Sequence, residues 1–523
     1  MFNPDPQYIS AFFPVSLLPV YLASASILLT TLFLLLHDPL RHIPGPALAR
    51  WTPLWLGHQA RVGNRYLAID SSAQKFGPII RIAPGHVSVA HADAVGVVYS
   101  HAQGSKPAYE KSTFYDSFIA GKPSVFSTRD RKDHSYKRRI VAQAFSYRAL
   151  EQFSPFIKVH IAKFIDKMDS FCITEESLNI VTWIHYMTFD VLSDLAFGEP
   201  GGMLASGSSF VSVQKGNEIF KDEDAIALID GREHLSAVLG ISPWFPWLAK
   251  IIPDSFYSNS FEATERLSDL ARQNVIKRMG SGTYRADILG KLIEAHLSNG
   301  EEEADMIPDL VAETVTLLTA GSDTTASSTS ALIYLVATHR QVYRKLLGEL
   351  MSAVDGEAVP SAAQVKDCIY LQAVVNEGLR VYSTVSTGLP RVVPEGGVEF
   401  LGVHIPAGTE ISVPAFTIQH DKAIWGDPEV FRPERWLQSA EQAQYLSRYL
   451  LPFSKGPRAC VTSAIRTFTS LDLHIHSLAY MEIQLILATV ILRYKIELQS
   501  ELESMEAFAH KATRLMVKLS LRG

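Results

Sequence analysis

The sequence is poor in cysteine, since Cys172, Cys368 and Cys460 are the only three in 523 residues. An odd and sparse count argues against a framework of disulfide bonds and fits a reducing compartment. Neither sign of charge dominates, because 48 basic and 54 acidic residues give a net charge of −6. This balance gives no indication of nucleic-acid binding. The chain also lacks internal repeats and a convincing flavin or nicotinamide fingerprint.

Charged residues are absent from the stretch between Ala11 and Leu36. This apolar stretch approaches the ~20 residues that a membrane span requires. We therefore predict a membrane anchor with a transmembrane helix over residues 1–40, a proline-rich hinge over 41–50 and a single large domain over 51–523. A cleaved signal peptide is the alternative, although no basic region precedes the apolar run.

The body of the chain has mostly helical periodicity, for example over residues 150–168, 261–279 and 330–351. Residues 76–84 and 86–89 instead favour a turn and two short strands. The sequence therefore predicts a mainly α fold with a minor β-sheet.

A loop that ends at Cys460 carries the strongest chemical signal. The stretch from Phe453 to Cys460 reads FSKGPRAC. A cysteine thiolate that ligates haem iron favours cleavage of the O–O bond. Gly456 permits a tight turn, Pro457 stiffens it, and Arg458 supplies a fixed cation. A small buried cysteine in a basic loop is the alternative interpretation.

Three further motifs accompany this loop. Glu377 and Arg380 lie three positions apart in a helical pattern, so their side chains can pair. Arg435 lies in the segment FRPERW, and the segment AGSDTT at 320–325 interrupts an apolar helical run over 307–337. With these motifs in this order, the chain resembles the cytochrome P450 family.

The resemblance implies the cytochrome P450 fold and haem b, with Cys460 as the axial thiolate ligand of the iron. It also implies that Glu377, Arg380 and Arg435 form a buried structural triad. Asp323 matches the acid that relays protons, and Thr324 matches the alcohol at the reacting centre. The residues that would contact the cofactor are Cys460, Phe453, His134, Arg138, Arg391 and Arg458.

The resemblance implies a monooxygenase that inserts one oxygen atom from O₂ into its substrate. The sequence, notably the stretch GLPRVVPEGG at 388–397, resembles fungal enzymes of the benzoate 4-monooxygenase group. This resemblance favours a small hydrophobic, aromatic substrate of the benzoate or stilbene type. Electrons would come from NADPH-cytochrome P450 reductase, attracted by a basic segment over 129–139. The endoplasmic reticulum membrane is the expected location, with the catalytic domain in the cytosol. The expected pocket residues are Phe114, Tyr115, Phe118, Ala320, Val385 and Leu389.

One segment departs from the family pattern. The helix expected soon after the ligand begins only at Leu478, 18 positions after Cys460, so about 13 residues over 462–476 are surplus. A genuine insertion and a retained intron or alternative splice form both fit this surplus. Because a displaced helix would no longer direct its amides toward the sulfur, a catalytically impaired or non-catalytic binding protein is the alternative function.

Overall fold

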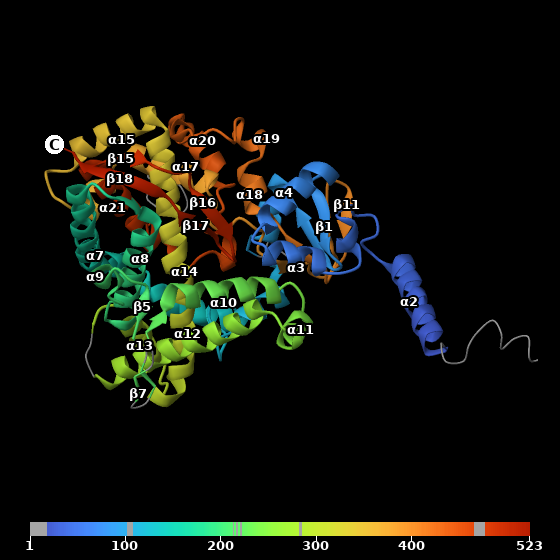
Figure 1. The fold of residues 1–523 in the computed structure, drawn as a ribbon. Coiled ribbons are helices and arrows are strands. Elements are labelled where there is room, and N and C mark those ends of the chain that lie inside the picture. The colour runs from blue at the N-terminus through green and yellow to red at the C-terminus, as the bar shows by residue number, and fades with distance from the viewer. Residues whose placement is uncertain are drawn as a thin grey trace, which may run out of the picture.

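The computed structural model describes residues 18–101, 108–212, 214–215, 218–219, 222–281, 285–464 and 476–522. Within this part the fold is mainly helical with small sheets, which confirms the predicted class (Figure 1). The long helices are α7 (Tyr147–Thr174), α8 (Ile180–Phe197), α10 (Ala225–Leu239), α12 (Ser255–Gly280), α14 (Glu303–Thr338), α15 (Arg340–Ala353), α17 (Ile369–Val381) and α21 (Leu478–Arg493). Shorter helices include α3 (Leu54–Arg61), α4 (Arg65–Phe76), α5 (Ala92–Val98), α6 (Arg131–Ala144), α11 (Phe245–Ile251), α13 (Ile288–Ser298) and α20 (Ala440–Ser447).

The largest sheet contains the two strands that the sequence predicts. Its strand order is β1 (Ile79–Ala83), β2 (His86–Val89), β12 (Glu410–Ser412), β9 (Arg391–Val392) and β3 (Glu110–Lys111). Near the C-terminus, β15 (Tyr494–Leu498), β18 (Met516–Leu521) and β4 (Ser177–Asn179) form a second sheet. The strands β16 (Glu503–Glu506) and β17 (His510–Arg514) form a hairpin that packs on α14.

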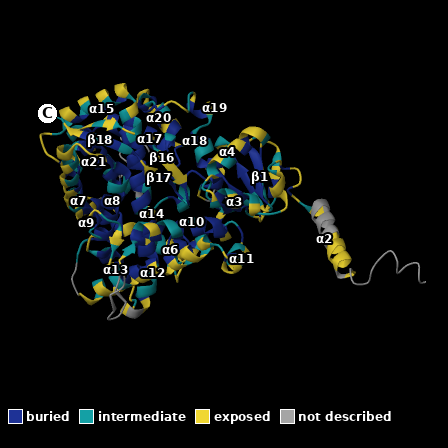
Figure 2. Ribbon diagram, viewed as in Figure 1, coloured by how far each residue is buried: buried dark blue, intermediate teal, exposed yellow. Residues whose placement is uncertain are grey.

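Helix α14 crosses the middle of the molecule and packs against α8, α12, α17 and α21 (Figure 1). Several of its hydroxyl groups bond to carbonyls of the same helix, as Thr319 does with Val315 at 2.7 Å, which lowers the cost of burying them. Gly321 permits close packing, since a Cβ there would lie 2.9 Å from a Leu192 methyl group of α8. The interior is accordingly buried while the outer helix faces remain exposed (Figure 2).

The predicted helical run over 330–351 is split between α14 and α15 at His339. His339 leaves the helical conformation, and its ring nitrogen Nδ1 lies 2.8 Å from the carbonyl oxygen of Leu335. The imidazole therefore provides a partner for a carbonyl at the end of the helix.

A buried ion cluster joins α17 to the segment before the cysteine loop. The Glu377 carboxylate accepts hydrogen bonds from Arg380 at 2.8 and 3.0 Å and from Arg435 at 2.9 Å. The Trp436 indole adds a further hydrogen bond at 3.1 Å. Because all of these side chains are buried, the cluster fixes the orientation of two separate segments.

The surplus segment begins and ends in a pair of short antiparallel strands. Strand β13 (Ser463–Ala464) pairs with β14 (His476–Ser477), and Ser463 lies opposite Ser477. Residues 465–475 of the predicted insertion lie outside the described residues. Ser477 caps α21 by accepting a hydrogen bond from the Tyr480 amide. The helix after the cysteine loop therefore starts close to that loop in space despite its displacement in sequence.

The predicted membrane anchor is described only in part. Residues 1–17 lie outside the described residues, and α2 (Leu18–His37) follows them. Among the helices that the structure describes, none combines the length and the apolar content that a membrane crossing requires.

We predict that deletion of residues 464–476 preserves the fold. The deletion joins Ser463 to Ser477, which are opposite each other in the β13–β14 pair. Cross-strand neighbours have Cα atoms ~4.5–5.5 Å apart, close to the ~3.8 Å of consecutive residues, so little movement is needed. Thermal unfolding of the two proteins should give midpoints within a few degrees. Loss of cooperative unfolding in the shortened chain would contradict this prediction.

Candidate active site

One cavity of about 250 Å³ brings the predicted motifs together. Its wall includes Cys460, the start of α21 and a segment of α14. The predicted residues found in this wall are Phe118, His134, Arg138, Ala320, Thr324, Val385, Leu389, Phe453, Arg458 and Cys460.

The loop before Cys460 is held in a tight turn. The φ angles of Ser454 and Gly456 are 56° and 68°, a region that favours glycine. A Cβ at Gly456 would lie 1.8 Å from the carbonyl oxygen of Tyr99, so glycine is required there. The Cys460 amide donates to the Phe453 carbonyl at 2.9 Å. This closed turn fixes the position of the sulfur at the cavity wall.

Three features surround the Cys460 sulfur. Leu478 and Ala479, the first residues of α21, line the same cavity, so the positive end of the helix dipole lies at the cavity that contains the sulfur. The Thr462 hydroxyl lies 3.0 Å from Sγ. The Phe453 ring packs against Tyr480 with a centroid separation of 5.3 Å. The arrangement suits a thiolate ligand that is partly shielded from water.

Cations gather in another part of the wall. Arg138 donates to the Ala459 carbonyl at 2.5 Å, and Arg458 donates to the carbonyls of Thr128 at 2.9 Å and Arg129 at 2.6 Å. Sequence reasoning missed Lys111, which lines the same cavity and donates to the Phe126 carbonyl. These cations therefore use neutral backbone partners.

Burial and mutual repulsion perturb this group of cations. Burial, followed by the charges of Arg391, Arg458 and Arg138, lowers the pKa of Lys111 well below its usual value. Burial and then Arg458 also lower the pKa of His134 to about 2, so the imidazole is neutral. A cluster of repelling cations beside a neutral donor suits a ligand with carboxylates, as haem has in its two propionates. The residues present therefore fit haem.

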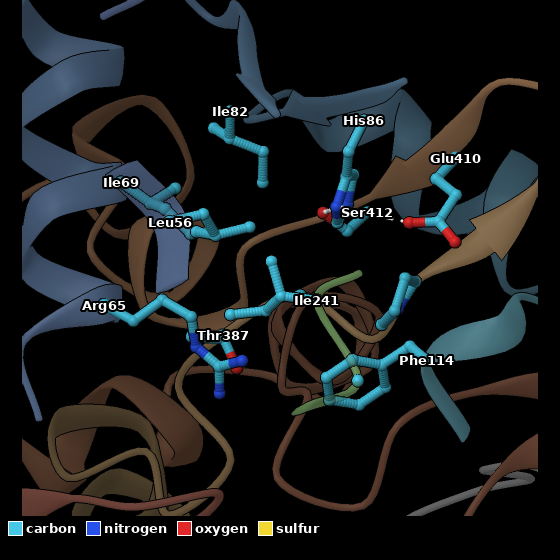
Figure 3. A pocket seen from close by; sticks show the side chains of 13 residues that line it. Leu56, Arg65, Ile69, Ile82, His86, Phe114, Ile241, Thr387, Glu410 and Ser412 are labelled. Atoms are coloured by element: carbon cyan, nitrogen blue, oxygen red, sulfur yellow. Dashed lines mark hydrogen bonds and ion pairs between the residues drawn. The ribbon is translucent and has the colours of Figure 1, made fainter. Parts of the chain in front are cut away.

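Four predicted residues do not lie in the cavity wall, namely Arg391, Tyr115, Phe114 and Asp323. Arg391 is buried, and its Nη1 donates to the Tyr115 hydroxyl at 2.6 Å, so the guanidinium is held behind the wall. Tyr115 packs within a buried aromatic cluster. Phe114 lines a separate pocket of about 20 Å³, which Figure 3 shows between His86, Glu410 and Arg65. Phe114 and Tyr115 thus lie outside the wall of the main cavity, although Phe118 of the same 3₁₀ helix lines it and Phe114 packs on Phe508.

The aromatic side chains that do face the cavity come from separate parts of the chain. Phe118, Phe126 and Phe508 line it and contact one another edge to face, with centroid separations of 5.0 to 5.6 Å. Sequence reasoning missed Phe126 and Phe508. This part of the wall offers flat apolar surface to a ligand.

Helix α14 presents Ala320, Gly321 and Thr324 to the cavity. The Thr324 hydroxyl donates to the Ala320 carbonyl at 2.7 Å. Asp323, the predicted proton-relaying acid, is 1 % exposed and does not line this cavity. Its carboxylate instead lies against His185 of α8 and Lys511 of β17.

Asp323 is connected to solvent through a second buried residue that sequence reasoning missed. Lys511 of β17 donates to Asp323 at 2.5 Å and also to Asp230 of α10, whose side chain is 43 % exposed. Burial raises the pKa of Asp323 to about 8 and lowers that of Lys511 to about 7. Burial therefore favours the neutral form of both groups. The contacts join the buried Asp323 through Lys511 to the half-exposed Asp230.

Comparison with known proteins agrees with this geometry. The family model described as Cytochrome P450 matches residues 44–519. The chain is 36% identical to benzoate 4-monooxygenase bphA of Aspergillus niger, with 92% of this chain and 93% of that protein covered. It is 28% identical to the cytochrome P450 monooxygenase prhB of Penicillium brasilianum over 92% of this chain and 94% of the relative. The predicted resemblance is confirmed.

We predict that removing carboxylates from the proton path slows product formation. Asp323→Asn should lower turnover by about a hundredfold, because positioned proton transfer contributes ~10²–10⁴-fold. Asp230→Asn should lower it by a smaller factor, since water can still reach Lys511. The measurement is the rate of product formation per bound haem.

Asp222→Asn serves as the matched control, because Asp222 is an exposed carboxylate that bonds Ser212. All three variants should bind haem and substrate normally. Unchanged turnover in both Asp323→Asn and Asp230→Asn would rule out the path.

Proposed function

Because the chain belongs to the cytochrome P450 family, we propose that this monooxygenase hydroxylates a small aromatic substrate of the benzoate type. Membership of the family makes it an oxidoreductase that holds haem through a cysteine thiolate. The observation that carries the proposal is the cavity in which Cys460, the cations and three phenylalanines meet. The extent of the similarity to benzoate 4-monooxygenase supports the choice of an aromatic substrate.

Haem bound at this site supplies the chemistry that activates O₂ and transfers one oxygen atom to the substrate. The chain supplies the surroundings. Cys460 provides the thiolate, and Lys111, Arg138 and Arg458 provide cations for the propionates. Thr324 offers a hydroxyl in the cavity, which Asp323 and Lys511 supply with protons from outside. The phenylalanines exclude water and hold an aromatic ring.

The electron donor in this proposal is NADPH-cytochrome P450 reductase. On α6 the side chains of Arg131, Lys132 and Arg139 are exposed. Lys137 is less available, because it pairs with Asp309 at 2.6 Å. Lys132 and Arg139 lie seven positions apart and so share a helix face, which suits an acidic flavoprotein.

The proposed location is the endoplasmic reticulum membrane, with residues 1–40 as a single-pass anchor and the catalytic domain in the cytosol. The uncharged stretch in the sequence supports the anchor. Exposed apolar side chains on the body support membrane contact, including Trp244 at 76 %, Trp247 at 66 % and Leu54 at 56 %. Arg61 at the end of α3 lies 3.6 Å from Asp254, which follows α11 in the chain. This contact brings α3, which carries Leu54, near α11, which carries Trp247.

We predict oxygen transfer from O₂ to benzoate in a reconstituted reaction. With haem-loaded protein, reductase, NADPH and ¹⁸O₂, mass spectrometry should find hydroxybenzoate with one added ¹⁸O atom. Omission of the reductase should abolish the product. A haem-loaded protein that oxidises NADPH with the reductase and leaves benzoate unaltered would contradict the proposed substrate.

We predict that the full chain sediments with endoplasmic reticulum microsomes and resists extraction at alkaline pH. Protease added to intact microsomes should digest the body, since it faces the cytosol, while a lumenal marker protein stays protected. Recovery of the chain in the soluble fraction would refute the anchor, and protection of the body would refute its orientation.

A further inference from the structure

A further buried arginine, distinct from the cations assigned to the propionates, lines the cavity. Arg232 of α10 is 2 % exposed. Its Nη2 donates to the Phe118 carbonyl at 2.9 Å, and its Nη1 lies 3.4 Å from the Thr319 hydroxyl. Thr319 precedes Ala320 on α14, so the guanidinium lies beside the helix that presents Thr324.

The charge of Arg232 has neutral hydrogen-bond partners. A backbone carbonyl and a hydroxyl accept from it, and within the described part of the chain no carboxylate lies close enough to form an ion pair with it. Burial lowers its pKa to about 10, so the guanidinium is still charged at neutral pH. A buried cation with neutral partners is costly and attracts an anion.

The neighbouring Glu233 forms no ion pair with Arg232 among the described residues. Glu233 also lines the cavity and is 3 % exposed. Burial, reinforced by the nearby Asp323 and opposed by Arg232, raises the pKa of Glu233 well above its ordinary value and so favours the neutral form. Its Oε2 has no hydrogen-bond partner among the residues that the structure describes. In the neutral form the carboxyl is a donor that can bond to the same anion as Arg232.

The aromatic part of the cavity adjoins this charge. Phe118 accepts from Arg232 through its carbonyl oxygen, while its ring lines the cavity with Phe126 and Phe508. A ligand with a carboxylate directly attached to a ring could therefore use both parts of the wall at once.

We propose that Arg232 binds the carboxylate of the substrate and makes the enzyme select aromatic acids over their neutral esters. This inference rests on the proposed function and adds the residue that sets its specificity. A purely structural role, in which Arg232 joins α10 to the turn at Phe118, predicts a different result in the following experiment.

The experiment uses the haem-loaded full-length protein and spectral titration with benzoate and methyl benzoate. The unaltered protein should bind benzoate more tightly than its ester. Arg232→Gln should weaken benzoate binding by at least about tenfold, because the charge-assisted hydrogen bonds are lost, and should leave the ester nearly unaffected. Arg232→Lys should recover part of the benzoate affinity. Arg266→Gln, which removes an exposed arginine from α12, is the matched control.

Each outcome decides between the interpretations. Equal weakening of acid and ester binding in Arg232→Gln would assign the residue a structural role and overturn the proposal. Tighter binding of the ester than of benzoate by the unaltered protein would also overturn it. If Arg232→Gln does not fold, the comparison of acid and ester in Arg232→Lys and the unaltered protein decides instead. An Arg232→Lys variant that loses benzoate affinity and keeps its affinity for the ester would support the proposal, because lysine lacks the fork of donors. Unchanged binding of both ligands, or equal loss of both, would overturn it.

A second pair of ligands, a long-chain fatty acid and its methyl ester, separates this proposal from the proposed function. Arg232-dependent preference for the fatty acid, without binding of benzoate, would support the carboxylate site and refute the aromatic substrate. Failure to bind either acid, in protein whose reduced CO-bound spectrum shows thiolate-ligated haem, would overturn the Arg232 proposal and leave the monooxygenase assignment intact.

Discussion

The position of one sulfur atom is the constraint on which the rest of this structure depends. Cys460 reaches the cavity only because the preceding turn is closed, and Gly456 makes that turn possible by packing directly on the Tyr99 backbone. The Glu377 cluster holds α17 against the segment that leads into the turn. Helix α21 then begins in the wall of the same cavity, with its N-terminus at the positive end of the helix dipole.

Buried charge is divided among three regions around the cavity. Lys111, Arg138 and Arg458 form a cationic group, and Asp323 pairs with Lys511 behind α14. Arg232 is a third charge, with neutral partners. Each arrangement is costly unless a ligand or a proton compensates it. This distribution fits a dianionic cofactor and agrees with the proton path and the acidic substrate that we propose.

The parts that the sequence could predict are those encoded in short segments. The cysteine loop, the pairing of Glu377 with Arg380 and the run on α14 depend on neighbouring residues, and the structure brings them together as expected. The sequence did not predict Lys111, Arg232 and Lys511 as site residues, because nothing in their local sequence indicates that they are buried. Arg391 was predicted to contact the cofactor. Its hydrogen bond to Tyr115 could not be predicted, because the two residues are far apart in the sequence. The sequence suggested that the surplus segment could displace the helix after Cys460. The pairing of Ser463 with Ser477, which keeps that helix near the loop, is a tertiary contact that the sequence does not reveal.

The most direct test of the account is the reduced, CO-bound difference spectrum of the purified full-length protein beside that of Cys460→Ser. The account predicts the red-shifted Soret band of thiolate-ligated haem in the unaltered protein and its loss in the variant. The same band in both proteins, or its absence from haem-loaded unaltered protein, would contradict it.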